Sequence, residues 1–400
     1  MIMKYFLLIL LVVISYQKMA YTQLNTWKSY YNRANELNNQ GKYLGAYHDA
    51  KMTVKIAKNT FTEHQRQLAD SYKLLSSVCY ALGKYHEAEI NSREAIKEDN
   101  ILYPVPGLHA AETLKGLAMV YHDYGRYRES EKLYLRALES IADTLGKSSL
   151  EYSSTMGDLA ELYKTMGDYH AADSLYHKAI AISRKIKDGE NLYYSTDLNN
   201  LASLYQEEKK YDLSSSLYIE AMHIDTHLLG TAHPRFANLL NNMGTLRREE
   251  GRYREADSLF RYARSIYKWN PGQVHPYFAS VLGNMGLNYF LQKDYKKAKK
   301  FYKRSKKLMG KALTKDHVYY GKCLYLLGKL YASTGDAKKA EDNYINALKI
   351  YENSLGKEHP KLAPLLEDIA VLFKTSGKRQ YSWELMENRA KAIREKYDPE

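Results

Sequence analysis

Residues 156–179 read MGDLAELYKTMGDYHAADSLYHKA, and related stretches return every 42 residues along the chain. At the centre of this stretch is the pattern GxYxxA, in which Gly167, Tyr169 and Ala172 hold the fixed positions. The position of Gly167 occurs nine times at a constant step of 42, and seven of the nine residues are glycine: Gly41, Gly83, Gly125, Gly167, Lys209, Gly251, Lys293, Gly335 and Gly377. A constant period of this length predicts a stacked array of repeats, because one unit cannot bury its apolar face alone.

Apolar residues on both sides of each turn follow a helical period. Before the turn of the fifth unit, Leu198, Leu201, Ala202 and Tyr205 share one helix face, and a similar run follows Tyr211. A glycine between two helices suits the left-handed conformation, which a residue without a Cβ atom adopts at no steric cost. We therefore predict an all-α fold, a right-handed superhelical solenoid of nine antiparallel helix pairs.

Small residues recur where the two helices of a unit must touch, and large aromatic residues recur opposite them. The small residues on the first helix include Ala160, Ala202, Gly244, Gly286 and Gly328. The aromatic residues on the second helix include Tyr176, Tyr218, Phe260, Tyr302 and Tyr344. Small residues against large ones let two helices interdigitate at a common distance, so we expect both sets to be structural.

The combined pattern resembles the tetratricopeptide repeat, whose usual unit of about 34 residues is lengthened here as in the kinesin light chain type. That subtype places a G-x-x-H-P turn between units, which stands at residues 230–234, 272–276 and 356–360, with a weaker copy at 314–318. The resemblance spans roughly residues 25 to 395. It implies a scaffold that binds a protein or peptide.

The amino terminus carries an apolar run of ten residues, YFLLILLVVI at 5–14, after a short charged start. This run is well below the roughly 18 to 20 residues that span a bilayer and is typical of a secretory signal peptide. We predict a signal peptide over residues 1–22, cleaved after Thr22, and a repeat array over residues 23–400 with degenerate terminal units. The protein would then be periplasmic or secreted, and an uncleaved membrane anchor is the alternative.

The formal net charge of +13 is densest in residues 293–311. One interpretation is a solvated outer helix face. The other is a basic surface that binds an anionic partner such as lipid head groups or acidic glycan. Nothing in the sequence resembles a base-reading module, so we expect no specific nucleic-acid partner, and membrane contact only through the basic face.

The thirteen histidines do not form a metal-binding pattern. His233, His275, His317 and His359 hold equivalent positions, expected on the order of 20 Å apart at two helix diameters, whereas ligands sit about 2 Å from a shared ion. We expect these histidines to cap turns, and we predict no metal or other cofactor. Without an HExxH, GxSxG or P-loop motif, we also predict that the protein is not an enzyme. Cys79 and Cys323 lie in distant units and should not pair.

In tetratricopeptide arrays the first helix of each unit lines a concave wall, and the resemblance places polar residues on that wall in units five to seven. These residues are Asn199, Asn200, Ser203, Gln206, Asn241, Asn242, Thr245, Arg248 and Asn284. An asparagine side chain offers both a donor and an acceptor, so a ladder of them can hold the backbone of an extended peptide. The resemblance implies the same role for Asn200, Asn242 and Asn284, and Arg248 could bind a carboxylate. The alternative is that the asparagines bridge adjacent helices.

Overall fold

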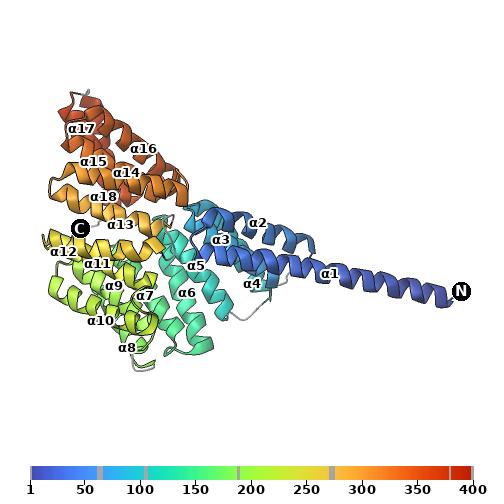
Figure 1. Ribbon diagram of the computed structural model, residues 1–400. Coiled ribbons are helices and arrows are strands. Elements are labelled where there is room, and N and C mark those ends of the chain that lie inside the picture. Colours follow the sequence, from blue (N-terminus) through green and yellow to red (C-terminus); the bar gives the residue numbers. More distant parts are fainter. Residues whose placement is uncertain are drawn as a thin grey trace. The chain divides into compact units, whose positions relative to one another are not determined.

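The computed structural model describes residues 2–60, 66–102, 107–186, 190–269, 275–377 and 380–397. These residues form nine consecutive helix pairs and no strand, as the repeat pattern predicts (Figure 1). The helices are α1 (Ile2–Asn39), α2 (Tyr43–Thr60), α3 (Arg66–Ala81), α4 (Tyr85–Leu102), α5 (Leu108–Asp123), α6 (Tyr127–Leu145), α7 (Leu150–Thr165), α8 (Tyr169–Ser183), α9 (Leu192–Glu207), α10 (Tyr211–Leu229), α11 (Pro234–Glu249), α12 (Tyr253–Tyr267), α13 (Pro276–Leu291), α14 (Tyr295–Ala312), α15 (Val318–Ser333), α16 (Ala337–Leu355), α17 (Ala363–Thr375) and α18 (Gln380–Tyr397), with the 3-10 helix η3 (Pro360–Leu362) before α17.

The chain divides into two compact units, Met1–Leu117 and Ala118–Glu400, with the boundary inside α5. In the first unit α1 packs on α2 and α3, and Trp27 donates a buried hydrogen bond to Ser71 Oγ at 2.8 Å. Helix α1 continues without a break past Thr22, and most side chains of the predicted signal segment lie outside the described residues. Within the described part of the chain, no helix is both long enough and apolar enough to cross a membrane.

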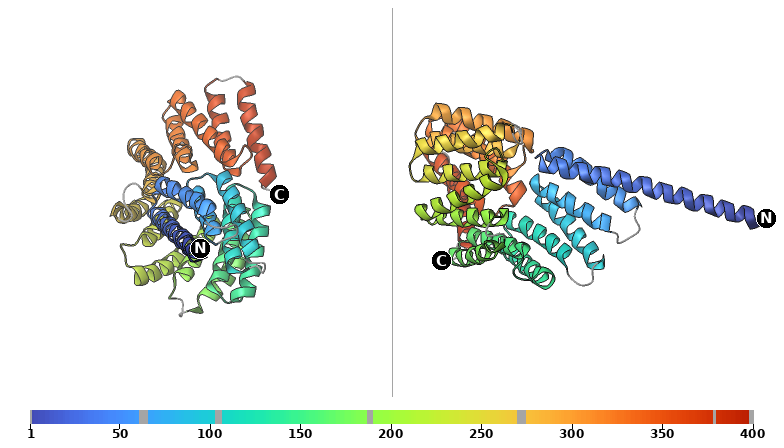
Figure 2. Two further views of the ribbon diagram at one scale, coloured as in Figure 1. Left: turned by 90° about the vertical axis from the view of Figure 1, so that its right-hand side faces the viewer. Right: turned by 60° about the horizontal axis from the view of Figure 1, so that its bottom comes forward.

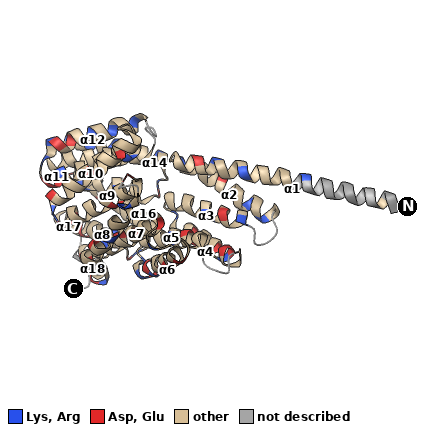
Figure 3. Ribbon diagram, turned by 90° about the horizontal axis from the view of Figure 1, so that it is seen from below, with Lys and Arg blue, Asp and Glu red and all other residues tan. Residues whose placement is uncertain are grey.

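In the second unit each helix packs mainly on its partner and on the next pair. The helix pairs follow one another along a curve (Figure 2). Basic and acidic residues are interspersed on helices such as α12 (Figure 3). Cys79, in the first unit, and Cys323, in the second, are buried and unpaired, as predicted.

All nine turns adopt the left-handed backbone conformation that the glycine pattern predicts. The seven turn glycines have positive φ, and Lys209 and Lys293 adopt a φ of 61° at the two turns without glycine. A residue with a Cβ atom pays a steric cost in this region. The repeat geometry therefore imposes the turn even where the sequence does not favour it.

The small residues of the first helices do pack against the aromatic residues of the second. A Cβ atom added at Gly286 would lie 2.5 Å from the Tyr302 ring, and one added at Gly244 would lie 2.7 Å from the Phe260 ring. Both rings are almost completely buried. These glycines are required by close packing, as the small-against-large pattern predicts.

The joints between repeats differ in chemistry along the second unit. Between the fourth and fifth repeats, the buried Asp197 accepts hydrogen bonds from Ser183 Oγ at 2.7 Å and from Ser153 Oγ at 3.1 Å. Burial raises the pKa of Asp197 to about 6, despite the two serine hydrogen bonds that lower it.

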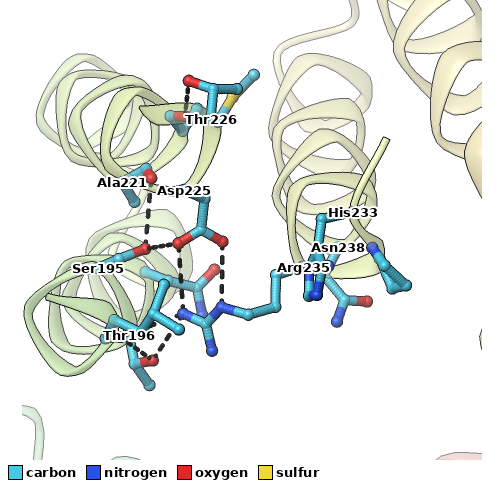
Figure 4. Close-up of polar contacts among 12 residues, drawn as sticks. Ser195, Thr196, Ala221, Asp225, Thr226, His233, Arg235 and Asn238 are labelled. Carbon is cyan, nitrogen blue, oxygen red and sulfur yellow. Dashed lines mark hydrogen bonds and ion pairs between the residues drawn. The ribbon is translucent and has the colours of Figure 1, made fainter. Parts of the chain in front are cut away.

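Between the fifth and sixth repeats, an ion pair takes this place. The buried Asp225 accepts hydrogen bonds from Ser195 Oγ at 2.6 Å and from Arg235 Nε at 3.2 Å (Figure 4). Arg235 also donates to Thr196 Oγ1 at 3.1 Å. Between the sixth and seventh repeats the joint is mainly apolar, built on a cluster that includes Tyr267, Phe278 and Val281.

Candidate binding groove

The first helices of successive repeats lie directly against one another. Helix α7 contacts α9, and the same contact continues from α9 to α11, α13, α15 and α17. The first helices therefore form one continuous wall. The expected spacing of about 20 Å between equivalent positions is wrong for this wall, because no second helix stands between two first helices.

The asparagine ladder joins neighbouring helices of this wall. Asn242 Nδ2 donates to Asn199 Oδ1 at 2.9 Å, and Asn284 Nδ2 donates to Asn241 Oδ1 at 2.9 Å. Asn199 Nδ2 donates in turn to Asn200 Oδ1 at 3.1 Å. The bridging role that the sequence left open as an alternative is thus present in the structure.

Bridging uses only part of what these carboxamides offer. All five asparagines are half-buried, and a carboxamide has two N–H donors and an oxygen with two lone pairs. Among the described residues, no partner is found for Asn200 Nδ2, Asn242 Oδ1 or Asn284 Oδ1. The ladder therefore keeps both donors and acceptors that a ligand backbone could use.

The other predicted groove residues have varied roles. Ser203 Oγ accepts from Lys164 Nζ at 3.1 Å, and Gln206 Nε2 donates to Glu249 Oε2 at 2.8 Å. Thr245 Oγ1 donates to the carbonyl of Asn241, one turn back on its own helix, at 3.1 Å. Ser203 and Gln206 thus belong to side-chain pairs between repeats, whereas Thr245 bonds within its helix.

Arg248 is the most deeply placed residue of the predicted set. Its side chain is 8% exposed, Nη1 has no hydrogen-bond partner, and Glu249 lies 3.9 Å from Nη2. Burial lowers the pKa of Arg248. A buried cation with an unused N–H group is costly, and a ligand oxygen could satisfy it.

Sequence reasoning missed a cation and a row of aromatic residues. Lys164 is almost buried and pairs with Glu161 at 2.9 Å and Glu207 at 3.5 Å. Tyr277 and Tyr319 are exposed, each with its ring against the histidine two residues before it, at centroid distances of 4.8 and 5.1 Å. The 42-residue step could have found them, since Lys164 aligns with Gln206 and Arg248, and the tyrosines align with Tyr193.

The four turn histidines act as helix caps. Nδ1 of His233, His275, His317 and His359 accepts the backbone N–H two residues later, at 3.0 to 3.2 Å. Burial lowers the pKa of His275 to about 4, so its ring is neutral at neutral pH. Of the motif at 272–276, Gly272 lies outside the described residues. No group of metal-ligating side chains is found in the part of the chain that the structure describes.

A sequence model of the tetratricopeptide repeat matches residues 109–185, 194–268 and 277–345, which together make up more than half of the chain. The chain belongs to the tetratricopeptide repeat family. The resemblance read from the repeats is therefore confirmed. No curated protein matches the chain in sequence.

Solved structures share this fold at low sequence identity. A Rap protein complexed with Competence and Sporulation Factor is 16% identical, covers 93% of this chain and 98% of its own, and has a TM-score of 0.61. The Rap conjugation gene regulator of plasmid pLS20, in complex with a Phr peptide, is 14% identical, with coverage of 93% and 95% and a TM-score of 0.55. BtubC (BKLC) from P. vanneervenii is 25% identical, covers 57% of this chain and 91% of its own, and has a TM-score of 0.46.

Proposed function

We propose that this protein is an exported, non-enzymatic scaffold that binds an extended peptide or protein segment along the inner wall of its fifth to seventh repeats. The observation that carries the proposal is the row of half-buried asparagines, which retains unused donors and acceptors. The family supports a protein-binding scaffold. Two structures of the same fold hold a named factor or peptide, which supports a peptide ligand for this chain.

Bridging and binding are compatible roles for the ladder. The bonds from Asn242 to Asn199 and from Asn284 to Asn241 restrict the rotamers of these side chains before a ligand arrives. A preorganised carboxamide loses less side-chain entropy on binding, which favours affinity. Main-chain contacts of this kind hold an extended segment and leave its side chains to other positions on the wall.

The test uses an immobilised library of random nonapeptides and compares two variant pairs. Asn200→Ala with Asn242→Ala should lower affinity on the order of a hundredfold, because each change leaves a buried ligand group unsatisfied at about 1–3 kcal/mol. The control pair, Asn343→Ala with Asn346→Ala on α16, should bind as wild type. If the ladder pair loses thermal stability but keeps its affinity, bridging is its only role and the proposal is wrong.

The basic face of α14 supports a second candidate, binding of an anionic partner. Helix α14 carries nine basic residues and no acidic one, and among the described residues only Lys297 forms an ion pair there, with Asp294 at 2.8 Å. Charge reversal at Lys299, Lys300, Lys306 and Lys307 should change mainly the association rate if the groove is the site. Loss of binding to anionic lipid vesicles or acidic glycan, with normal peptide capture, would instead favour the basic face.

Export is tested separately by amino-terminal sequencing. A cleaved signal peptide predicts a mature chain that begins near residues 21 to 23 and lies outside the cytoplasm. Recovery of Met1 from a membrane fraction would support the anchor instead.

A further inference from the structure

The last helices of the second unit contact the turn between its first two helices, α5 and α6. His359, before η3, has Nε2 3.1 Å from the carbonyl oxygen of Asp123, and the Tyr397 hydroxyl of α18 donates to the carbonyl of Gly125 at 3.4 Å. The Tyr397 and Tyr127 rings meet edge to face, with centroids 5.5 Å apart. The hydrogen-bonded partners are 236 and 272 residues apart in sequence. Nearest-neighbour packing of repeats does not require such contacts.

The hydrogen positions on His359 follow from its two bonds. Nδ1 accepts the backbone N–H of Lys361 at 3.2 Å, so Nε2 of the neutral ring carries the hydrogen and donates to the Asp123 carbonyl. Burial, together with the positive charge of Lys361, lowers the pKa of His359 to about 3. Nε2 of His359 thus bonds to a distant repeat while Nδ1 caps its own turn, so the cap histidine also helps to close the unit.

Gly125 lets the two ends approach. It has a φ of 78°, as the turn requires, and a Cβ atom at this position would lie 3.0 Å from His359 Cδ2. The same glycine therefore serves the turn and the contact. We name the set of His359, Tyr397, Asp123, Gly125 and Tyr127 the seam.

Helix α18 packs much more extensively on α17 than on α6 across the seam. Ion pairs hold α18 to three neighbouring segments: Arg389 pairs with Glu352 on α16 at 2.6 Å, Arg394 with Glu367 on α17 at 2.7 Å, and Lys396 with Glu358 in the turn after α16 at 2.7 Å. A cavity of about 440 Å3 lies along the seam, lined by residues that include Tyr127 and Tyr169 on one side and Ile393 and Tyr397 on the other. Packing across the seam is thus incomplete, and α18 would move with α16 and α17 if the seam opened.

Two exposed side chains of α15 lie within electrostatic reach of seam and inner-wall residues. Tyr319 is 51% exposed, yet burial and the charge of Asp123, a seam residue, raise its pKa. Lys322, on the same helix, is exposed too, and its pKa is lowered by desolvation and by the charges of Lys361 and Arg248. Both side chains are therefore open to solvent and still surrounded closely enough by protein for their pKa values to shift.

We propose that the seam is a side gate through which an extended polypeptide segment enters and leaves the interior of the second unit. The proposal rests on the proposed function only in taking the inner wall as the surface that a ligand must reach. A solenoid can widen by small rotations spread over its joints, so opening needs no local unfolding. Two hydrogen bonds and one ring pair would then set how often the interior is open.

The test measures access to Lys322→Cys, a cysteine placed on the inner wall, with N-ethylmaleimide and with a 5-kDa polyethylene glycol maleimide. Tyr397→Ala removes the ring contact and one hydrogen bond of the seam. It should speed the large reagent about tenfold, equivalent to about 1.4 kcal/mol of closure, and leave the small reagent nearly unchanged. Background labelling should be low, because Cys79 and Cys323 are buried and their pKa values are raised.

Two controls are built into the chain. Tyr381→Ala changes an exposed tyrosine of the same helix α18 and should leave both rates as they are. A cysteine at the outer position, Lys307→Cys, should react equally with both reagents in every background. If Tyr397→Ala leaves the large reagent as slow as before, or if that reagent already labels Lys322→Cys quickly, the interior is reached by another route and the proposal is wrong.

A second measurement avoids dependence on the folding of Tyr397→Ala. Spin labels at Arg128→Cys on α6 and Lys391→Cys on α18 report the distance across the seam in the otherwise intact chain. We expect a main short distance with a longer minor one, and Tyr397→Phe, which loses only the hydroxyl, should increase the longer fraction about twofold to threefold. A single distance unaffected by Tyr397→Phe would overturn the gate. Neither measurement uses a ligand, so its outcome is independent of the asparagine test.

Discussion

At the joint between the fourth and fifth repeats, the buried Asp197 is held by two serines. The equivalent residue two repeats later, at the joint between the sixth and seventh, is Val281 in an apolar cluster. Both side chains are buried and both stand at the same place in the 42-residue unit. The repeat backbone thus accepts either chemistry. The repeat period therefore fixes where a joint lies. The residues at the joint decide whether its stability depends on close packing, on an ion pair or on pH.

The largest loss of stability is expected when side-chain volume is removed from the apolar joint. Phe278→Ala removes a ring that is 1% exposed in the cluster with Tyr267 and Val281, and should cost about 4 kcal/mol. Hydrogen exchange should show α12 to α14 opening before the fourth and fifth repeats, because contacts are mainly between neighbours. Phe290→Ala, at a half-buried position of the same helix, should cost clearly less. Uniform loss of protection over the whole second unit would contradict independent joints.

The ion-pair joint should be destabilised when one partner is removed and the other charge stays buried without a partner. Arg235→Ala leaves the buried Asp225 without its guanidinium, at a cost of about 3 kcal/mol in urea denaturation. The double variant Asp225→Leu with Arg235→Leu should lose less, since it imitates the apolar joint and leaves no buried charge. A double variant less stable than Arg235→Ala would mean that the polar chemistry is required at this joint.

The aspartate joint should respond to pH. The folded pKa of Asp197, about 6, lies above its ordinary value of 3.8, so the folded state holds the proton more tightly. This contribution to stability is present below about pH 4 and is lost as pH rises through 6, by about 3 kcal/mol. Asp197→Asn should remove that loss in denaturation measured from pH 4 to 7.5. Asp212→Asn, at an exposed position, should keep the wild-type profile, and a profile of Asp197→Asn equal to wild type would refute the assignment.

The smallest effect is expected at the turns that the two regions share. Lys209, in the fifth repeat, and Lys293, in the seventh, both hold a φ of 61°. Replacing either by glycine should stabilise the array by about 0.5–1 kcal/mol, because the strain of a Cβ atom slightly exceeds the entropy lost by glycine. Lys210→Gly, where φ is −81°, should not stabilise. Equal changes in stability for Lys209→Gly and Lys210→Gly would contradict the explanation by backbone strain.

Much of the fold could be predicted because it depends on local pattern. The spacing of Gly167, Tyr169 and Ala172 predicted the turns, the helix pairs and the small-against-large packing, and the structure confirms each of them. The placement of the asparagines on successive first helices could also be anticipated. Their partners could not, because the bond from Asn242 to Asn199 depends on how closely two first helices pack.

Sequence by itself determined the period, the helices and the chemistry available at each position, since these follow from backbone sterics and from apolar spacing within one unit. Tertiary structure alone decided which positions meet across repeats: that Asp197 reaches Ser153, that Arg248 is left with an unused N–H group, and that Tyr397 touches Gly125. The reason is geometric. A small rotation at each joint accumulates along the array, so contacts between distant repeats depend on the sum of many joints.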